Sequence, residues 1–147
     1  LEEIDVFEPL KAITLWDVFE HLKDGRKYLN LLREILRSDG VLFLQIPSAD
    51  SLAAKILHEK CNMFDGLEHV NLYSFKAIQQ LASDCGYEIL DIQTVISEIG
   101  VINNYLNYED PYFGDASNKT DIHNVIDEDA IHKHLLGYKY QVTLGII

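Results

Sequence analysis

The chain has 147 residues, 48% of them hydrophobic and 10% aromatic, which is enough to bury the core of one domain and excludes a disordered tail. Its formal net charge of −12 leaves no basic run that could neutralise phosphates, so nucleic acids and anionic membranes are poor partners. The sequence shows no secretory segment and no apolar run that could span a bilayer. We therefore expect a cytoplasmic protein that acts on a small neutral or cationic molecule.

The first part of the chain predicts a strand, a helix and a second strand. Residues 12–15 form a short apolar run, and residues 41–46 form another between Gly40 and Pro47. Consecutive apolar residues are typical of strands that are buried on both faces. Between the two runs, residues 24–37 place apolar side chains on one side at helical spacing. The pattern predicts a βαβ unit with parallel strands and a right-handed crossover.

Further elements follow along the chain. A helix is expected from residue 48 or 50 to about residue 59, after which Ser74 caps the clearest helix and Gly86 ends it. Residues 87–95 alternate as a strand, residues 127–136 predict a short helix, and residues 138–147 predict the closing strand. The segment between the last two strands, residues 96–137, is interpreted as an insertion or lid, because residues 96–126 have little periodicity and many turn-forming residues.

Several common sites are not encoded. None of the eight glycines forms a GxG, GxGxxG or GxxxxGK motif, so no dinucleotide or phosphate cradle is predicted. The six histidines include no HExxH motif, and we expect no metal site. The cysteines Cys61 and Cys85 form no CxxC pair, and Cys85 belongs to the apolar stripe of a helix, so a core role is expected.

The stretch AITLWDVFEHL, residues 12–22, places polar side chains directly after a buried strand. A second acid and histidine pair, Glu68 and His69, lies in a loop after the next strand. In open α/β sheets, ligands bind outside the carboxyl ends of the strands. We therefore expect His21 and His69 to flank one crevice. The alternative interpretation makes Trp16 a core residue and leaves His21 exposed without a role.

These residues carry a family resemblance. Residues 12–51 resemble the second half of a class I S-adenosylmethionine-dependent methyltransferase. In this resemblance strand four comes first and an EHL motif follows it. A helix and strand five come next and together carry the pattern LRxILxxxGxLxLxxP. Residues 62–90 continue it with an EHVNLYS loop, a helix, a CGY turn and strand six. The resemblance implies an α/β fold, a partial Rossmann-like methyltransferase sheet with strands in the order 4-5-7-6 and an antiparallel last strand, flanked by helices.

The resemblance also implies a function and its residues. The chain would be the C-terminal part (residues 1–147) of an enzyme that transfers a methyl group from S-adenosylmethionine to an oxygen or nitrogen of a small metabolite. It lacks the glycine-rich turn and the ribose-binding acid of the family's first half, so the chain alone is expected to be inactive. The implied residues are Leu15, Trp16 and Asp17 on the cofactor side, His21 or His69 as the base, and Glu20, Met63, Phe64, Asn71 and Tyr73 along the methyl acceptor.

Two alternatives remain open. The chain could be a non-catalytic methyltransferase-like module whose activity is association with itself or a partner, or a different Rossmann-like enzyme such as a dehydrogenase, which the WDVFEHL motif argues against. If strand four lies at an exposed edge, we expect a homo-oligomer that covers this edge.

Overall fold

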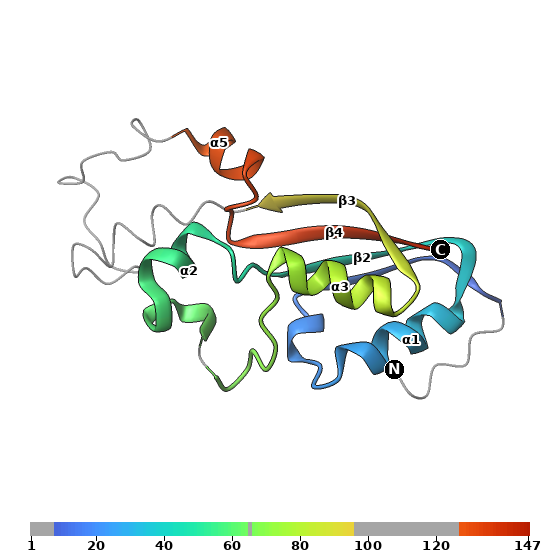
Figure 1. The fold of residues 1–147 in the computed structure, drawn as a ribbon. Helices are drawn as coiled ribbons and strands as arrows, with labels where there is room; N and C mark the ends of the chain where they lie inside the picture. Colours follow the sequence, from blue (N-terminus) through green and yellow to red (C-terminus); the bar gives the residue numbers. More distant parts are fainter. Residues whose placement is uncertain (1–7, 65, 96–126) are drawn as a thin grey trace.

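The computed structural model describes residues 8–64, 66–95 and 127–147. They form one mixed four-stranded sheet with helices packed against it (Figure 1). In chain order the elements are β1 (Leu10–Trp16), η1 (Phe19–His21), α1 (Gly25–Ile35), β2 (Leu36–Pro47), α2 (Leu52–Leu57), η2 (His58–Lys60), η3 (Asn62–Phe64), α3 (Phe75–Asp84), β3 (Tyr87–Val95), α5 (Glu128–Lys133) and β4 (Lys139–Ile146).

The strand order is β1-β2-β4-β3. β1 pairs with β2 in parallel, whereas β4 is antiparallel to both β2 and β3. This arrangement confirms the predicted 4-5-7-6 order with an antiparallel last strand. Because β1 has a neighbour on one side only within the described residues, it forms an edge of the sheet there. The carboxyl ends of β1 and β2 and the start of β4 therefore lie at the same end of the sheet.

Capping side chains set the helix boundaries. Asp24 accepts a hydrogen bond from the Lys27 amide at the start of α1, and Ser74 accepts one from the Ala77 amide at the start of α3. Gly86 follows α3 with a φ of 76°, a conformation that glycine adopts without steric cost. These N-caps and the glycine stop agree with the sequence prediction.

Several element boundaries differ from the predictions. β2 begins at Leu36 rather than at residue 41, because Leu36 already pairs with Leu10 before an irregularity in the ladder. α1 therefore ends at Ile35. α2 ends at Leu57, where His58 takes a φ of 49° and the chain continues as a short 3-10 helix.

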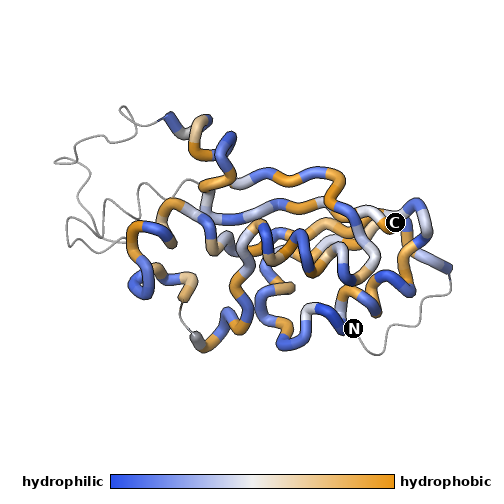
Figure 2. Tube along the Cα trace, in the orientation of Figure 1, coloured by the Kyte–Doolittle hydropathy of each residue, from blue (hydrophilic) through white to orange (hydrophobic). Residues whose placement is uncertain are grey.

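The main core lies between the sheet and the helices α1 and α3, which cover the same face (Figure 1). Alternate residues of the central strands point into this core: Leu42, Leu44 and Ile46 from β2, and Tyr140, Val142 and Leu144 from β4. Figure 2 shows polar and apolar residues alternating along β3 and β4, whereas residues 41–46 of β2 are apolar except for Gln45. The residues that alternate with these core residues in β2 and β4 point to the other face of the sheet and are half-buried. The helices α1 and α3 therefore bury one face of the sheet more completely than the other face is buried.

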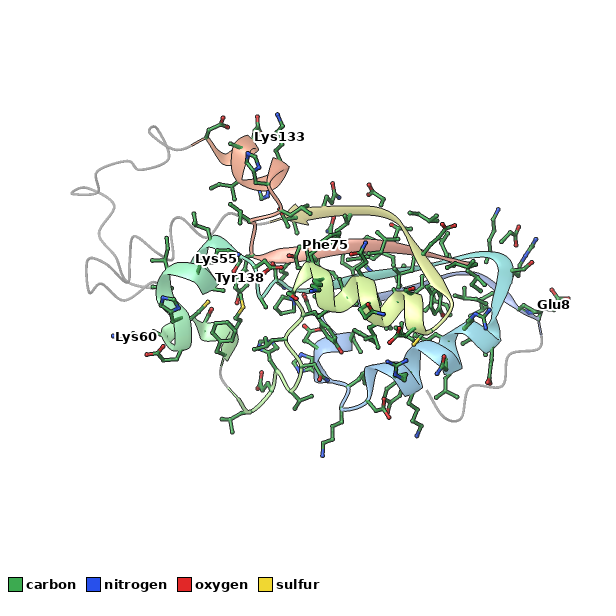
Figure 3. The ribbon with its side chains drawn as sticks, in the orientation of Figure 1. Glu8, Lys55, Lys60, Phe75, Lys133 and Tyr138 are labelled. Carbon is green, nitrogen blue, oxygen red and sulfur yellow. The ribbon has the colours of Figure 1, made fainter. Side chains whose placement is uncertain are left out.

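A second, smaller core forms beside α2. It consists of the buried residues Ala53, Ala54, Cys61 and Met63, and Tyr138 packs against it. Figure 3 shows Tyr138 beside this helix, where its hydroxyl donates a hydrogen bond to the Asn62 side chain at 3.1 Å.

Both cysteines are buried and form no disulfide bond within the described residues, with Cys61 in this cluster and Cys85 in the main core, as expected for core residues. Within the described ranges, no helix has the length and apolar character that crossing a membrane requires. The predicted insertion lies mostly on residues 96–126, outside the described residues, so the lid role stays a prediction.

Candidate functional site

The short helix η1 places two polar residues at the end of β1. Phe19 anchors η1, because its side chain is completely buried and stacks on Tyr73 with ring centroids 5.3 Å apart. Glu20 and His21 follow directly in the chain. Burial of Phe19 therefore fixes the backbone from which these two side chains extend.

The two predicted histidines lie together. The ring centroids of His21 and His69 are 5.1 Å apart. This distance confirms the prediction that the loop after β1 and the loop before α3 bring them to one place. Their common position is at the carboxyl end of β1, where the sequence predicted a crevice.

Backbone carbonyls orient both imidazole rings. Nδ1 of His21 lies 2.6 Å from the Glu68 carbonyl oxygen, and Nδ1 of His69 lies 3.1 Å from the Met63 carbonyl oxygen. A carbonyl oxygen only accepts, so each Nδ1 carries the proton in these bonds. In a neutral ring this tautomer leaves the acceptor lone pair on Nε2.

Glu20 is buried beside the histidines. Its side chain is 1% exposed, and neither carboxylate oxygen has a hydrogen-bond partner among the described residues. Burial raises the pKa of the Glu20 carboxyl above its ordinary value, although the neighbouring His21 favours the charged form. Its Oε1 lies 3.8 Å from Nε2 of His21. A buried acid without a hydrogen bond is costly, so this group is a candidate for a functional role.

Asn71 joins the two loops. Its backbone amide donates to the Glu20 carbonyl oxygen at 3.0 Å, and its side-chain amide donates to the carbonyl oxygen of Leu22. These two bonds hold the segment with His69 against the segment with His21. The structure therefore gives Asn71 a positioning role, while its predicted contact with a methyl acceptor stays a prediction.

The other predicted acceptor residues differ in exposure. Met63 is completely buried in the smaller core, and Phe64 is half-buried beside it. Tyr73 is 8% exposed, and burial raises its pKa to about 12. Met63 and Tyr73 thus shape the site from inside the core, and their roles toward a methyl acceptor stay predictions.

The predicted cofactor-side residues lie at the end of β1, with Leu15 and Trp16 in the strand and Asp17 directly after it. Leu15 belongs to the main core, whereas Trp16 is 53% exposed and lies against Phe43 with ring centroids 4.7 Å apart. Asp17 has a φ of 52°, which turns the chain away from the strand. The structure therefore leaves an aromatic surface at the edge of the sheet, next to the turn.

Asp17 is linked to β2 and β4. Its Oδ2 accepts hydrogen bonds from Gln45 at 3.1 Å and from Lys139 at 2.7 Å, whereas its buried Oδ1 has no hydrogen-bond partner among the described residues. Gln141 extends this polar network, because its Nε2 donates a hydrogen bond to Oε1 of Gln45 at 2.9 Å. Sequence reasoning missed Lys139, because it lies 122 residues from Asp17 and only the sheet topology brings them together.

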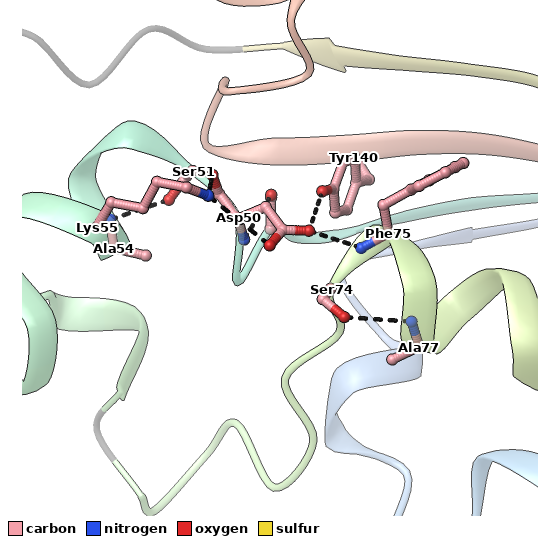
Figure 4. A network of polar contacts seen from close by, with 9 residues as sticks. Asp50, Ser51, Ala54, Lys55, Ser74, Phe75, Ala77 and Tyr140 are labelled. Atoms are coloured by element: carbon pink, nitrogen blue, oxygen red, sulfur yellow. Dashed lines mark hydrogen bonds and ion pairs between the residues drawn. The ribbon is translucent and has the colours of Figure 1, made fainter.

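A second polar network lies at the end of β2 (Figure 4). Oδ2 of Asp50 accepts hydrogen bonds from the Phe75 amide at 2.7 Å and from the Tyr140 hydroxyl at 2.8 Å. Burial alone would raise the pKa of Asp50, but these bonds and the charge of Lys55 lower it overall. Asp50 thus ties the end of β2 to α3 and β4. The sequence indicated it only as a possible helix cap.

The fold and this site define a class of protein: an α/β domain of the class I methyltransferase type. A family model described as "Methyltransferase domain" matches residues 4–92, more than half of the chain. The chain therefore belongs to the methyltransferase domain family. None of the proteins of curated function matches the chain.

Solved structures share the fold. A complex between the Haloferax volcanii Trm112 methyltransferase activator and a methyltransferase matches with a TM-score of 0.57 and 11% identity, over 97% of this chain and 57% of that chain. An S-adenosylmethionine-dependent methyltransferase from Clostridium acetobutylicum matches with a TM-score of 0.54 and 12% identity. The match covers 98% of this chain and 61% of that chain. The mycolic acid cyclopropane synthase CmaA1, complexed with SAH and CTAB, matches with a TM-score of 0.54 and 21% identity. The match covers 97% of this chain and 57% of that chain.

The coverage shows a difference in size. This chain spans about three fifths of the length of each of these structures. The described glycines, at positions 25, 40, 66, 86, 137 and 145, include no tight turn between a strand and the helix that follows it of the kind that holds a nucleotide. The described residues therefore do not by themselves form a complete site for S-adenosylmethionine.

Proposed function

We propose that this chain is the C-terminal part of an enzyme that transfers a methyl group from S-adenosylmethionine to an oxygen or nitrogen of a small molecule. The observation that carries the proposal is the meeting of Glu20, His21 and His69 at the carboxyl end of β1 in a domain of the methyltransferase family. Two structures that match it, a magnesium protoporphyrin IX methyltransferase and the O-methyltransferase NcsB1, were solved with S-adenosylhomocysteine, which supports this cofactor.

The chain contributes the acceptor side of the site in this proposal. Leu15, Trp16 and Asp17 would form only a wall on the cofactor side, because the chain lacks the glycine turn. His21 or His69 takes the proton from a hydroxyl acceptor, for which an imidazole with an Nε2 lone pair is suited. The acceptor oxygen would then use the electron pair left on it to form a bond to the methyl carbon, while the bond between that carbon and the sulfonium sulfur breaks and S-adenosylhomocysteine leaves.

The acceptor would lie between the two loops. Asn71 and Phe64 are half-buried and would reach the acceptor, whereas Glu20, Met63 and Tyr73 are buried and would support them from inside. Aromatic and apolar side chains with few polar groups are typical of sites for small organic molecules.

A second candidate is a non-catalytic methyltransferase-like module that associates with itself or with another protein. The exposed edge strand β1 and the half-exposed Trp16 favour this alternative. An edge strand offers unpaired backbone groups to a further strand. For both candidates we propose that other protein covers the β1 edge. When the 147-residue chain is alone, a further copy of the chain covers it and a homo-oligomer forms.

Calorimetry with S-adenosylhomocysteine separates the two candidates. We expect the 147-residue chain to bind it no better than weakly, since a glycine turn supplies many of the orienting contacts in such sites. A gene that encodes a glycine-rich turn upstream of Leu1 should yield a longer protein with low-micromolar binding and methyl transfer. Low-micromolar binding of S-adenosylhomocysteine by the 147-residue chain would contradict the proposal that the chain is only the C-terminal part of the enzyme. A longer protein that does not bind S-adenosylhomocysteine would favour the non-catalytic module.

The base is tested in the longer protein at saturating cofactor. His21→Ala and His69→Ala should be compared with His58→Asn, which removes an exposed imidazole in η2. General-base catalysis contributes about 100-fold to 10,000-fold. We expect one of the first two variants to lose turnover on that scale while His58→Asn keeps it. Wild-type turnover in both would leave neither histidine a role as base.

A further inference from the structure

Glu20, His21 and His69 form a cluster whose geometry resembles that of a metal site. Each offers one ligand atom, and these three atoms all lie within 4.8 Å of one another. In a tetrahedral site with bonds of roughly 2.1 Å, the ligand atoms lie about 3.4 Å apart. Each side chain therefore has to move by less than about 1 Å to reach a common ion.

The buried carboxylate provides a second and independent observation. Glu20 is 1% exposed, and both of its oxygens lack a hydrogen-bond partner among the described residues. Buried carboxylates in folded proteins are normally hydrogen-bonded, paired with a charge or bound to a metal. A cation between Glu20 and the two imidazoles would supply the missing interaction.

The histidines are held as metal ligands usually are. A ligating histidine commonly donates its second ring N–H to a carbonyl or carboxylate, which fixes the ring and its tautomer. His21 donates through Nδ1 to the Glu68 carbonyl oxygen, and His69 donates through Nδ1 to the Met63 carbonyl oxygen. Both rings therefore have Nε2 as the ligating atom in their neutral form.

The backbone keeps the three residues in place. Asn71 binds the Glu20 and Leu22 carbonyl oxygens and so joins the two loops that carry the cluster. An ion can reach the cluster from solvent, because the His21 side chain is 38% exposed. The net charge of −12 also raises the local concentration of cations around the protein.

We propose that Glu20, His21 and His69 bind one divalent transition-metal ion of the Zn²⁺ type. Two imidazoles and one carboxylate suit Zn²⁺, Co²⁺ or Mn²⁺, whereas Mg²⁺ prefers an octahedral shell of oxygen atoms. This proposal departs from the sequence analysis, which expected no metal because the ligands follow no single local motif. The metal would leave one coordination position open, and while it is bound it occupies the Nε2 lone pairs, so the base role proposed above applies to the metal-free protein.

Binding does not depend on the proposed methyl transfer, so it is measured on the 147-residue chain without cofactor. Co²⁺ is titrated into the protein and followed by visible absorption, since tetrahedral Co²⁺ gives a strong and distinct spectrum. We expect one equivalent to bind, Zn²⁺ to displace it, and Mg²⁺ at the same concentration to leave it bound. No absorption with excess Co²⁺, or Co²⁺ bound only weakly as an octahedral ion, would overturn the proposal.

Variants assign the site. Glu20→Gln, His21→Ala and His69→Ala should each weaken Co²⁺ binding at least 10-fold, whereas His58→Asn should bind as the wild type does. Glu20→Gln decides the result if an alanine variant fails to fold, because it keeps the shape of the side chain, and circular dichroism checks its fold. Binding that Glu20→Gln leaves unchanged, or that His58→Asn removes, would show that the ion binds elsewhere.

Discussion

Self-association through the edge of β1 is the first prediction, and Trp16 is the residue to change. A tryptophan has an accessible surface of about 250 Å², so its 53% exposure leaves about 130 Å² open to water. At about 25 cal/mol per Å², covering this surface is worth up to about 3 kcal/mol per copy. Trp16→Lys would remove this contribution and place a charge on the edge strand, so the dissociation constant should rise at least about 100-fold.

Sedimentation velocity from nanomolar to high-micromolar concentration measures the change. Leu90→Lys is the matched control, because Leu90 is 54% exposed and lies on β3 at the opposite edge of the sheet. Trp16 is also the only tryptophan, so its fluorescence should shift to shorter wavelengths as the wild type associates. A wild type that stays monomeric throughout this range, or equal losses in the two variants, would refute a role for the β1 edge.

Three further predictions concern stability, measured by chemical denaturation with a chelator present. Glu20→Gln should raise the free energy of unfolding at pH 7 by about 1–3 kcal/mol, because a buried charge that no hydrogen bond stabilises is replaced by a neutral amide. The pKa of Glu20 is raised in the folded state, so the wild type loses stability as pH rises through that pKa, and the gain should vanish under acidic conditions. Asp50→Asn should cost about 1 kcal/mol at pH 7 through weaker bonds from Phe75 and Tyr140, because the Asp50 side chain is 38% exposed and water screens its charge. The pKa of Asp50 is lowered, so this loss should shrink as pH falls through it; a loss independent of pH would contradict the assignment. Tyr87→Phe should cost about 1 kcal/mol by removing a buried bond to an α1 carbonyl oxygen, and an unchanged midpoint would show that this bond contributes nothing.

Local patterns predicted most of the fold. The apolar runs at residues 12–15 and 41–46 identified two buried strands, and Ser74 and Gly86 marked the ends of α3. The start of β2 was missed, because residues 37–40, RSDG, have the composition of a turn. Pairing between Leu36 and Leu10 outweighs this local preference, and pairing between distant residues cannot be read from composition.

The candidate site was predicted in part. The repeated acid and histidine pairs indicated that His21 and His69 meet, but nothing in the sequence showed which acid is buried. Glu20 follows Phe19, whose burial carries Glu20 inward, whereas Glu68 stays exposed in its loop. The link between Asp17 and Lys139 depends on the place of β4 in the sheet, which only the tertiary fold determines.

The position of β4 has a consequence for biosynthesis. β4 is the last of the described strands to be synthesised, yet it lies between β2 and β3. Among the described strands, β3 has no partner and β2 pairs with β1 alone until residues 139–146 emerge from the ribosome. Folding of the sheet therefore waits for late synthesis, and a chain shortened before Lys139 loses two of the three strand interfaces at once. During that interval the open backbones of β2 and β3 are the places where wrong pairing with other nascent chains would begin.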